Sequence, residues 1–288
     1  MTAALDFLIE LLDLEVIDDN IFRGKDTGED RQRTFGGQVA AQALVAAGRT
    51  VERTKQVHSL HAYFLRPGDA KYPTVYQVDR IRDGRSFATR RVVAIQHGEA
   101  IFNLQASFHV VEEGVDHHDP MPIVAEPENL PTFRERFAEY AEQMGDWYTR
   151  PRPIDLRYLV DPSRLAAGPQ DPIMQMWFKA DGPLPEDPLL HACVVAYTSD
   201  MSLLDSIIIG HGLRWDDGTM QGASLDHAMW FHRPFRADDW VLYDMRSPSA
   251  AGARGLALGN MFTNDGKLVV TVAQEGLIRL TEKGWSRR

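Results

Sequence analysis

The chain has 288 residues, of which 44% are hydrophobic and 25% are charged. At roughly 150 residues per domain, this length indicates about two folded units or one large one, with enough apolar residues for a substantial core. Asp and Glu outnumber Lys and Arg by 41 to 31, which gives a net charge of −10. This charge argues against a fold-wide basic surface for nucleic acid, although a local arginine cluster could still bind a small anionic ligand. The single cysteine, Cys193, excludes a disulfide framework and a cysteine-based zinc site.

The chain shows no sign of a targeting segment or a membrane span. No stretch approaches about 18 uninterrupted apolar residues. Residues 1–19 are acidic and carry neither a basic flank nor a small-residue cleavage site, and the final residues GWSRR differ from a peroxisomal tripeptide. Together with the single cysteine, which suits a reducing compartment, these features predict a cytoplasmic protein.

The first part of the chain predicts helices followed by an antiparallel meander. Apolar residues at helical spacing predict a short helix over residues 4–14, and residues 21–26 are predicted to be extended. Residues 36–51 are apolar nearly all round, which predicts a buried helix. Strands are predicted over residues 58–68, 74–82, 86–96 and 100–110, which are separated by turn-forming residues such as Asp-Gly and His-Gly.

Residues 112–170 are rich in proline, and we predict a connection across the surface with one amphipathic helix at about 132–144. The first pattern then returns. An extended segment is predicted at 175–182, a mostly apolar helix at 187–205, and strands at 225–235, 240–247, 254–263 and 267–280. We therefore divide the chain into an N-terminal unit (residues 1–112), a linker with one helix (113–150) and a C-terminal unit (151–288).

Three matches between the two parts indicate an internal duplication. The string FLRP beginning at Phe64 matches FHRP beginning at Phe231, an offset of 167 residues. Arg85 matches Arg254 at an offset of 169, and the hairpin residues Gly98 and Gly266 match at 168. A near-constant offset in the same element order predicts one unit made twice, each a buried helix with an antiparallel sheet.

The chain contains, in this order, the strings RTFGGQVAAQAL, HSLHAYFLRPGD, DGRSFATRRVVAIQ, YTSDMSLLD, SLDHAMWFHRPF and VTVAQEGLIR. In order and spacing they resemble the acyl-CoA thioesterase II family, over nearly the whole chain and most weakly across residues 112–170. The resemblance implies an α+β double hot-dog fold and hydrolysis of medium- to long-chain fatty acyl-CoA to fatty acid and CoA, without a metal or redox cofactor. It also implies a catalytic set of Asp200, Ser224 and Gln274, in which Ser224 keeps the hydroxyl that the family carries on Thr or Ser.

The chemistry of thioester hydrolysis fits these three residue types. The reaction needs a water held against the carbonyl carbon, a group that takes the water's proton, and donors for the oxyanion. Asp200 lies near the end of an apolar helix with no adjacent cation in sequence, so it is either an exposed helix-end acid or a functional group. Ser224 could position a water or satisfy backbone at a strand start, and Gln274 could face either the site or solvent. The residues leave open whether Asp200 acts as a base or as a nucleophile.

Residues that could bind the substrate carry weaker signals. Gly36, Gly37 and Gln38 open the first buried helix, where backbone N–H groups could bind an oxyanion or phosphate, or where glycine could only permit tight packing. His58 could be a general base or a structural histidine. The densest basic run could bind the phosphates of CoA or be solvated surface. It consists of Arg66, Arg85, Arg90 and Arg91, of which the last two are adjacent and point to opposite faces of a strand.

Other site types lack their motifs. The chain has no G-x-S-x-G, no P-loop, no G-x-G-x-x-G and no H-E-x-x-H. His227 and His232 lie five residues apart on one predicted strand and point to opposite faces, so we expect no metal shared between them. Cys193 lies inside a helix and is predicted to be a small core residue. Because the helix of the first unit carries no acid, we expect one hydrolytic site per chain.

Two other functions remain open from the residues. One is an enoyl-CoA hydratase or dehydratase on the same fold, which would pair a histidine with a carboxylate. The other is a non-catalytic sensor that binds acyl-CoA. In each case the expected partner is acyl-CoA, with no nucleic acid. Edge strands of such sheets pair between subunits, so we also expect a homo-oligomer, either a dimer or a tetramer.

Overall fold

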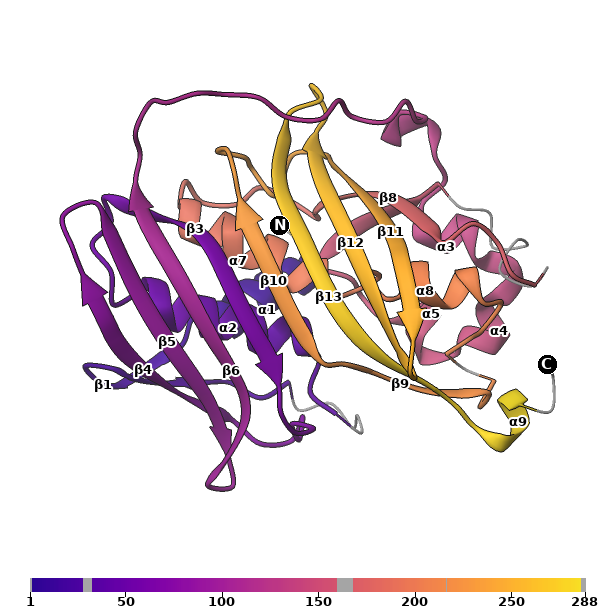
Figure 1. Ribbon diagram of the computed structural model, residues 1–288, viewed down its shortest axis with the longest axis horizontal. Coiled ribbons are helices and arrows are strands. Elements are labelled where there is room, and N and C mark those ends of the chain that lie inside the picture. The colour runs from indigo at the N-terminus through magenta and orange to yellow at the C-terminus, as the bar shows by residue number, and fades with distance from the viewer. Residues whose placement is uncertain (1, 28–32, 160–167, 216, 286–288) are drawn as a thin grey trace.

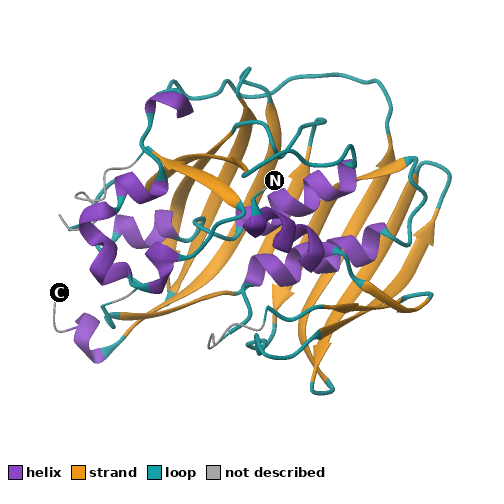
Figure 2. Ribbon diagram, turned by 180° about the vertical axis from the view of Figure 1, so that it is seen from behind, coloured by secondary structure: helices purple, strands orange, loops and turns teal. Residues whose placement is uncertain are grey.

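A single thirteen-stranded sheet carries the fold. The computed structural model describes residues 2–27, 33–159, 168–215 and 217–285. The strands follow the order β1-β2-β4-β5-β6-β3-β10-β13-β12-β11-β8-β7, and β9 pairs with β13. Figure 1 shows the strands of the first half beside those of the second, and Figure 2 shows the helices together on the opposite side of the sheet.

The elements follow the predicted order with small shifts in their ends. The first half contains α1 (Ala3–Leu12), β1 (Glu15–Asp18), β2 (Ile21–Gly24), α2 (Gly36–Gly48), β3 (Lys55–Phe64), β4 (Thr74–Asp83), β5 (Phe87–Gln96) and β6 (Glu99–Val110). The connection contains η1 (Pro127–Asn129), α3 (Phe133–Arg136), η2 (Ala138–Tyr140), α4 (Ala141–Met144) and α5 (Asp146–Thr149). The second half contains β7 (Ile154–Tyr158), β8 (Ile173–Ala180), α7 (Pro188–Ser199), α8 (Asp205–Gly210), β9 (Met220–Ser224), β10 (Asp226–Phe231), β11 (Val241–Ala251), β12 (Arg254–Thr263), β13 (Leu268–Leu280) and α9 (Glu282–Trp285).

The two halves meet about a pseudo-twofold axis between β3 and β10. With the predicted offset of 167 residues, Ala228 is the counterpart of His61, and these two residues pair directly across the two strands. Hydrogen bonds repeat as well: Val110 N–H donates to the Ser86 carbonyl at 3.0 Å, and Ile278 N–H donates to the Ala253 carbonyl at 2.8 Å. The structure therefore has the internal repeat that the sequence predicted, joined into one continuous sheet.

The helices α2 and α7 pack against each other behind the sheet and run in opposite directions. A Cβ atom at Gly37 would lie 2.4 Å from the carbonyl oxygen of Tyr197, near the end of α7. A Cβ atom at Gly48 would lie 2.5 Å from the side chain of Leu189, near the start of α7. This close approach requires small residues in α2, which explains why glycine and alanine occupy its contacts with α7.

The end of α7 differs from the prediction. The apolar pattern predicted one helix over 187–205, but α7 ends at Ser199, with Asp200 as its C-terminal capping residue, and α8 starts at Asp205. The hydroxyl of Thr198 donates to the carbonyl of Val194 at 2.8 Å. Such a local bond competes with a continuing helix, and the break brings Asp200 to the helix end instead of into its middle.

The predicted strand at 225–235 is also shorter in the structure. It forms β10 over Asp226–Phe231, because the following Pro234 has no N–H for a central strand. The segment before it, which was not predicted as a strand, forms β9 and pairs with the end of β13.

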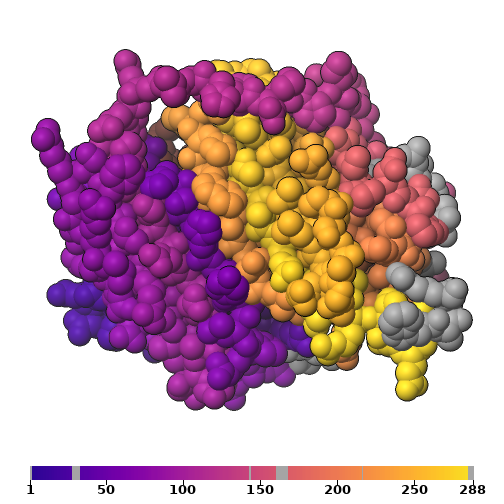
Figure 3. Space-filling model, viewed as in Figure 1, coloured from indigo at the N-terminus to yellow at the C-terminus, as the bar shows by residue number. Residues whose placement is uncertain are grey.

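The connection between the halves runs across the surface, as Figure 3 shows at the upper edge of the molecule. The helix predicted at 132–144 is broken into α3, η2 and α4, since Phe137 and Tyr140 leave helical geometry (ψ of 15° and 7°). Upstream, Asp116 pairs with Arg233, and the Ala125 carbonyl accepts a hydrogen bond from the Trp177 indole at 2.9 Å. These contacts fix the connection to the second half.

Arg90 is a structural residue inside the first half. Its side chain is 1% exposed, and its guanidinium donates to the Thr50 hydroxyl and carbonyl, both at 2.8 Å, and to the Arg82 carbonyl at 3.0 Å. It also pairs with Asp83. These bonds join the end of α2 to the β4–β5 hairpin and leave no side of the guanidinium for a ligand.

We predict that Arg90→Ala lowers the free energy of unfolding by about 2–4 kcal/mol, because it leaves several buried acceptors without donors. Urea unfolding measures this change. The control is Arg91→Ala on the exposed neighbour, which should change stability by less than about 0.5 kcal/mol. Equal stability of the two variants would contradict the role assigned to Arg90.

Candidate active site

Asp200, Ser224 and Gln274 converge from three elements. Asp200 ends α7, Ser224 ends β9, and Gln274 lies in β13. The Gln274 Nε2 donates to Asp200 Oδ1 at 2.8 Å, and the Ser224 Oγ donates to the same oxygen at 3.3 Å. The three residues that the family resemblance predicted therefore form one hydrogen-bonded cluster.

The Asp200 carboxylate is held in a poorly solvated position. Burial raises its pKa above the ordinary value, and the hydrogen bonds from Gln274 and Ser224 partly offset this effect by stabilising the charged form. The Gly37 backbone N–H acts in the same direction as these hydrogen bonds. A carboxylate with a raised pKa is a stronger base than a solvated one, as proton abstraction from water requires.

His227 and Ser199 extend the cluster and were not among the predicted site residues. His227 is 1% exposed, and its Nδ1 lies 3.0 Å from Gln274 Oε1 while its Nε2 lies 2.8 Å from Ser199 Oγ. Since the Gln274 amide nitrogen donates to Asp200, its oxygen faces Nδ1, which must carry the proton. Burial lowers the pKa of His227, so the ring is neutral and its Nε2 accepts from Ser199.

The first turn of α2 lies against Asp200. A Cβ atom at Gly36 would lie 2.6 Å from Asp200 Oδ2, so only glycine fits at this distance. The N–H groups that open a helix have no helical acceptors, and they give the first turn a partial positive charge. Gln38, also in this turn, is buried and lines a cavity beside the site.

The other candidate residues are not gathered at this site. His58 lies near the opposite end of β3, where its Nε2 lies 2.8 Å from Ser107 Oγ. Arg85 is exposed and precedes Ser86, whose carbonyl accepts a hydrogen bond from Val110 at the end of β6. Arg91 is also exposed and pairs with Asp79. Arg66 is exposed two residues after Phe64, on the Asp200 side of the sheet. Of the predicted arginines, this side holds Arg66 alone.

A mainly apolar cavity of about 320 Å³ lies near the cluster and is lined by residues adjacent to it in sequence. Phe35 and Tyr197 line it and meet edge to face at 5.1 Å between ring centroids. Met201, which directly follows Asp200, also lines it, and α1 and β7 supply the opposite wall. The cavity therefore approaches Asp200 through its neighbours Tyr197 and Met201, and Trp147, Arg150 and Arg152 also line it.

Two further findings limit other site types. Among the residues that the structure describes, no three His, Cys, Asp or Glu side chains could together hold a metal ion. None of the helices in the described ranges has the length and apolarity that crossing a membrane requires. His227 is buried in β10 and His232 is exposed just beyond its end at Phe231, so the two do not share one strand as the sequence predicted.

Known proteins resemble this chain in sequence and in fold. A family model described as acyl-CoA thioesterase matches residues 153–277, and one described as acyl-CoA thioesterase N-terminal domain matches residues 27–109. Acyl-CoA thioesterase 2 of Haemophilus influenzae is 40% identical over 98% of this chain and 100% of its own length. The chain belongs to the acyl-CoA thioesterase II family.

Other relatives agree with this assignment. Human acyl-coenzyme A thioesterase 8 is 41% identical over 94% of this chain and 88% of its own length. The crystal structure of the acyl-CoA thioesterase II TesB2 from Mycobacterium marinum is 47% identical, with a TM-score of 0.79 over 96% of this chain and 99% of that one. A hot-dog protein from Alicyclobacillus acidocaldarius, at 21% identity and a TM-score of 0.78, supports the fold alone. The α+β double hot-dog fold expected from the sequence is confirmed.

We predict that Gly37→Ala lowers kcat by about tenfold to a hundredfold, because the new methyl group would displace the α2 start from the Tyr197 carbonyl beside Asp200. Steady-state kinetics measure the effect. The control is Gly48→Ala at the other end of α2, where the methyl group meets only the movable Leu189 side chain. We expect near-normal kcat for this control, and similar losses in both variants would contradict a local effect.

Proposed function

We propose that Asp200, Ser224 and Gln274 activate one water for attack on the thioester of a fatty acyl-CoA. The proposal rests above all on the convergence of Gln274 and Ser224 on the same oxygen of Asp200. An acyl-CoA thioesterase does not carry out the proton transfers of an enoyl-CoA hydratase. A sensor that only binds acyl-CoA would not need a hydrogen-bonded carboxylate of this kind. We therefore set both alternatives aside.

In the proposed mechanism the two oxygens of Asp200 have different tasks. Oδ1 is held by Gln274 and Ser224, so Oδ2 accepts the proton of the water. The Ser224 hydroxyl donates to Asp200, and its lone pairs accept the second hydrogen of that water. The water oxygen forms a bond to the thioester carbon, and the carbonyl electrons move to oxygen.

The first turn of α2 stabilises the negative charge that develops on that oxygen. The Gly37 N–H is directed to Asp200 and the Gln38 N–H donates to the Phe35 carbonyl at 3.1 Å, so the first turn offers the Gly36 N–H and its partial positive charge. When the tetrahedral intermediate collapses, the C–S bond breaks, and the proton held by Asp200 moves to the leaving thiolate. The products are the fatty acid and CoA.

The cavity beside Asp200 is proposed to hold the acyl chain. Its walls are mainly apolar, and its volume is about 320 Å³. If a methylene occupies about as much space as a water molecule in liquid, roughly 30 Å³, the cavity takes an acyl chain on the order of ten carbons. This favours the medium-chain end of the medium- to long-chain range expected from the resemblance.

Further parts of the proposal concern the assembly and its location. Each chain is proposed to contain one hydrolytic site, in the second half. We propose a homo-oligomer in the cytoplasm, with subunit contacts that cover the sheet edges at β1 and β7. Sedimentation of the purified protein measures the oligomeric state.

We predict that Asp200→Asn lowers kcat for decanoyl-CoA by at least about a hundredfold, because the amide cannot accept the water's proton. Thiol release measures turnover. The buried Cys193, whose pKa is raised by burial, does not react with the thiol reagent in the folded protein. Asp187→Asn at the other end of α7 is the matched control and should keep full kcat. Undiminished turnover in Asp200→Asn would assign the base to another group.

The pH dependence of kcat/KM should carry the signature of Asp200. The base must be ionised, so activity is lost as pH falls through its pKa, which burial has raised. We therefore expect an acid limb at higher pH than for a solvated aspartate, with a slope of about tenfold per pH unit. The limb should be unchanged in His232→Leu. A limb at the ordinary aspartate value would contradict the buried base.

We predict that His227→Leu lowers kcat by about tenfold with little change in KM, because the Gln274 amide loses the donor that fixes its orientation. Leucine is the natural comparison, since Leu60 holds the equivalent position in the first half. His227→Asn, which can still donate to Gln274, should recover part of the loss. If His227→Leu lowers the stability of the fold but does not lower kcat at an unchanged KM, then His227 has only a structural role.

A further inference from the structure

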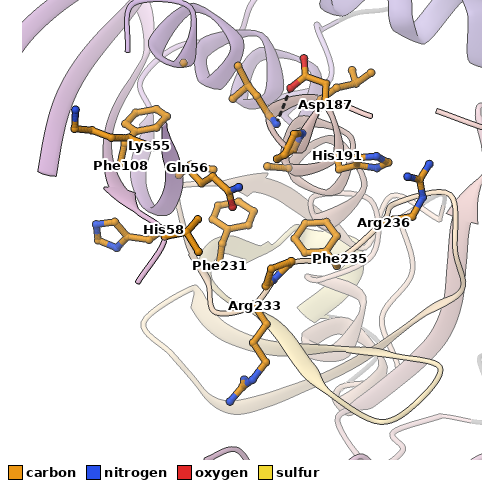
Figure 4. A pocket seen from close by; sticks show the side chains of 18 of the residues that line it. Lys55, Gln56, His58, Phe108, Asp187, His191, Phe231, Arg233, Phe235 and Arg236 are labelled. Atoms are coloured by element: carbon orange, nitrogen blue, oxygen red, sulfur yellow. Dashed lines mark hydrogen bonds between the residues drawn. The ribbon is translucent and has the colours of Figure 1, made fainter. Parts of the chain in front are cut away.

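A second cleft lies at the opposite end of the helix pair from Asp200. It is formed by the end of α2, the start of α7, the start of β3 and the ends of β6 and β10, and has a volume of about 1650 Å³. Figure 4 shows Lys55 on one side of this cleft, Asp187 and Arg236 on the other, and Gln56 and Phe231 between them. The volume exceeds that of most small-molecule pockets.

The pseudo-twofold axis relates the second cleft to the active site. The active site lies where the start of α2 meets the end of α7, and the second cleft lies where the start of α7 meets the end of α2. Ser224 pairs with Gly276, and the equivalent pair in the first half is Val57 with Phe108, both of which line the second cleft. The second cleft is thus the duplicate of the active site.

None of the catalytic side chains is repeated there. Arg49 follows α2 as Asp200 follows α7, so a cation stands where the acid would be. Val57 replaces Ser224, and the equivalents of His227 and Gln274 are Leu60 and Ala106. Hydrolysis by the mechanism proposed above is impossible without these groups.

The N–H donors are absent too. At the start of α7 the first helical residue is Pro188, which has no N–H, and the N–H of Leu189 donates to the Asp187 carboxylate at 3.0 Å. At the start of α2 the residues in the same two helical positions are Gly36 and Gly37, which both have an N–H group. The second cleft therefore has no oxyanion donors at this position.

The cleft has nonetheless stayed open and keeps features of a binding site. Val57 and Leu189 line its wall and are only partly buried. The rings of Phe231 and Phe235, which also line it, stack at 6.4 Å between their centroids. The cleft thus combines an apolar wall with a rim of charged side chains. An open cleft of this size with an exposed apolar wall indicates a binding surface.

Cations gather on the α2–β3 side of the cleft. Arg49 and Lys55 pair with Asp13 and Glu52, whose side chains are 75% and 78% exposed, and Arg53 is exposed. Ion pairs with such exposed partners are weak and exchange readily for a phosphate. The acidic side chains lining the cleft lie in both halves: Asp13, Glu52 and Glu112 in the first, and Glu186, Asp187, Asp239 and Asp265 in the second. Of the first three, Asp13 and Glu52 are the ones already paired with Arg49 and Lys55.

We propose that the second cleft binds a second acyl-CoA without hydrolysing it. The acyl chain lies along the apolar wall, and the phosphates lie on the α2–β3 side. The choice of ligand rests on the proposed function, because the cleft duplicates the site to which that function assigns acyl-CoA. The binding itself goes beyond that function, since it needs no catalytic group.

The first experiment counts the ligands bound per chain. The probe is the S-decyl thioether of CoA, which has no carbonyl and cannot be hydrolysed. Calorimetric titration of the full chain, continued to saturation, should give two ligands per chain, and only one if the proposal is wrong. Turnover of decanoyl-CoA is measured in parallel, so that a failure of the proposed hydrolysis is seen separately.

The second experiment fills the cleft. Gln56→Trp places an indole between the cations and the Phe231 ring, and it should reduce the count from two ligands to one with unchanged kcat. The matched control is Gln77→Trp on the exposed face of β4, which should keep two. Two ligands bound to a folded Gln56→Trp would overturn the proposal. So would a change in sedimentation with no change in ligand count, because the cleft would then be a protein interface.

A third variant tests the cationic side. Arg53→Glu should weaken the second binding event by about fivefold at low salt and leave the first unchanged. Arg246→Glu, an exposed arginine on β11, is the control and should weaken neither event. If both charge-reversal variants had equal effects on the two binding events, the placement of the phosphates on the α2–β3 side would be contradicted.

Discussion

The close antiparallel contact between α2 and α7 is the constraint on which the rest of the structure depends. It brings the start of one helix to the end of the other, with glycine where a Cβ atom would collide with the Tyr197 carbonyl. The positive end of α2 thereby faces a carboxylate that sits at the negative end of α7. An acid at a helix C-terminus is unfavourable by itself, and the neighbouring first turn of α2 supplies part of the compensation.

The same contact explains how a symmetric fold contains an asymmetric pair of sites. The two ends of the helix pair have the same backbone arrangement, and only the side chains differ. Arg49 at the end of α2 forms the favourable pairing of a cation with a helix C-terminus, whereas Asp200 forms the unfavourable one. Stability favours the first arrangement and the proposed hydrolysis needs the second, so a duplicated chain can have both.

Much of the fold could be predicted because its signals are local. Alternating strands with Asp-Gly and His-Gly turns gave β4, β5 and β6, and the offset between matching strings gave the duplication. The end of α7 could not be predicted, because the apolar pattern continues to residue 205 and the break depends on a local side-chain bond of Thr198. The breaks at Phe137 and Tyr140 have the same local character and interrupt a pattern that is otherwise helical.

The candidate site shows a different limit. Asp200, Ser224 and Gln274 were predictable as a set from the resemblance, but nothing in the sequence joins His227 to Gln274. Their contact requires the register of β10 on β13, which is set by strands about 45 residues apart and by packing on both faces. The placement of Arg90 also depends on a contact between distant segments. The Thr50 carbonyl after α2 accepts a hydrogen bond from its guanidinium, and this bond directs the side chain into the interior.

The hydrogen bonds of this cluster form a single directed chain. A neutral His227 accepts from Ser199 at Nε2, so its Nδ1 must donate to Gln274. Gln274 then has its amide nitrogen toward Asp200, and Ser224 donates to the same Oδ1. If His227 rotated or lost its proton at Nδ1, Gln274 could turn its oxygen toward the carboxylate and repel it. The buried imidazole therefore decides which oxygen of Asp200 is occupied, and with it which one remains for the water.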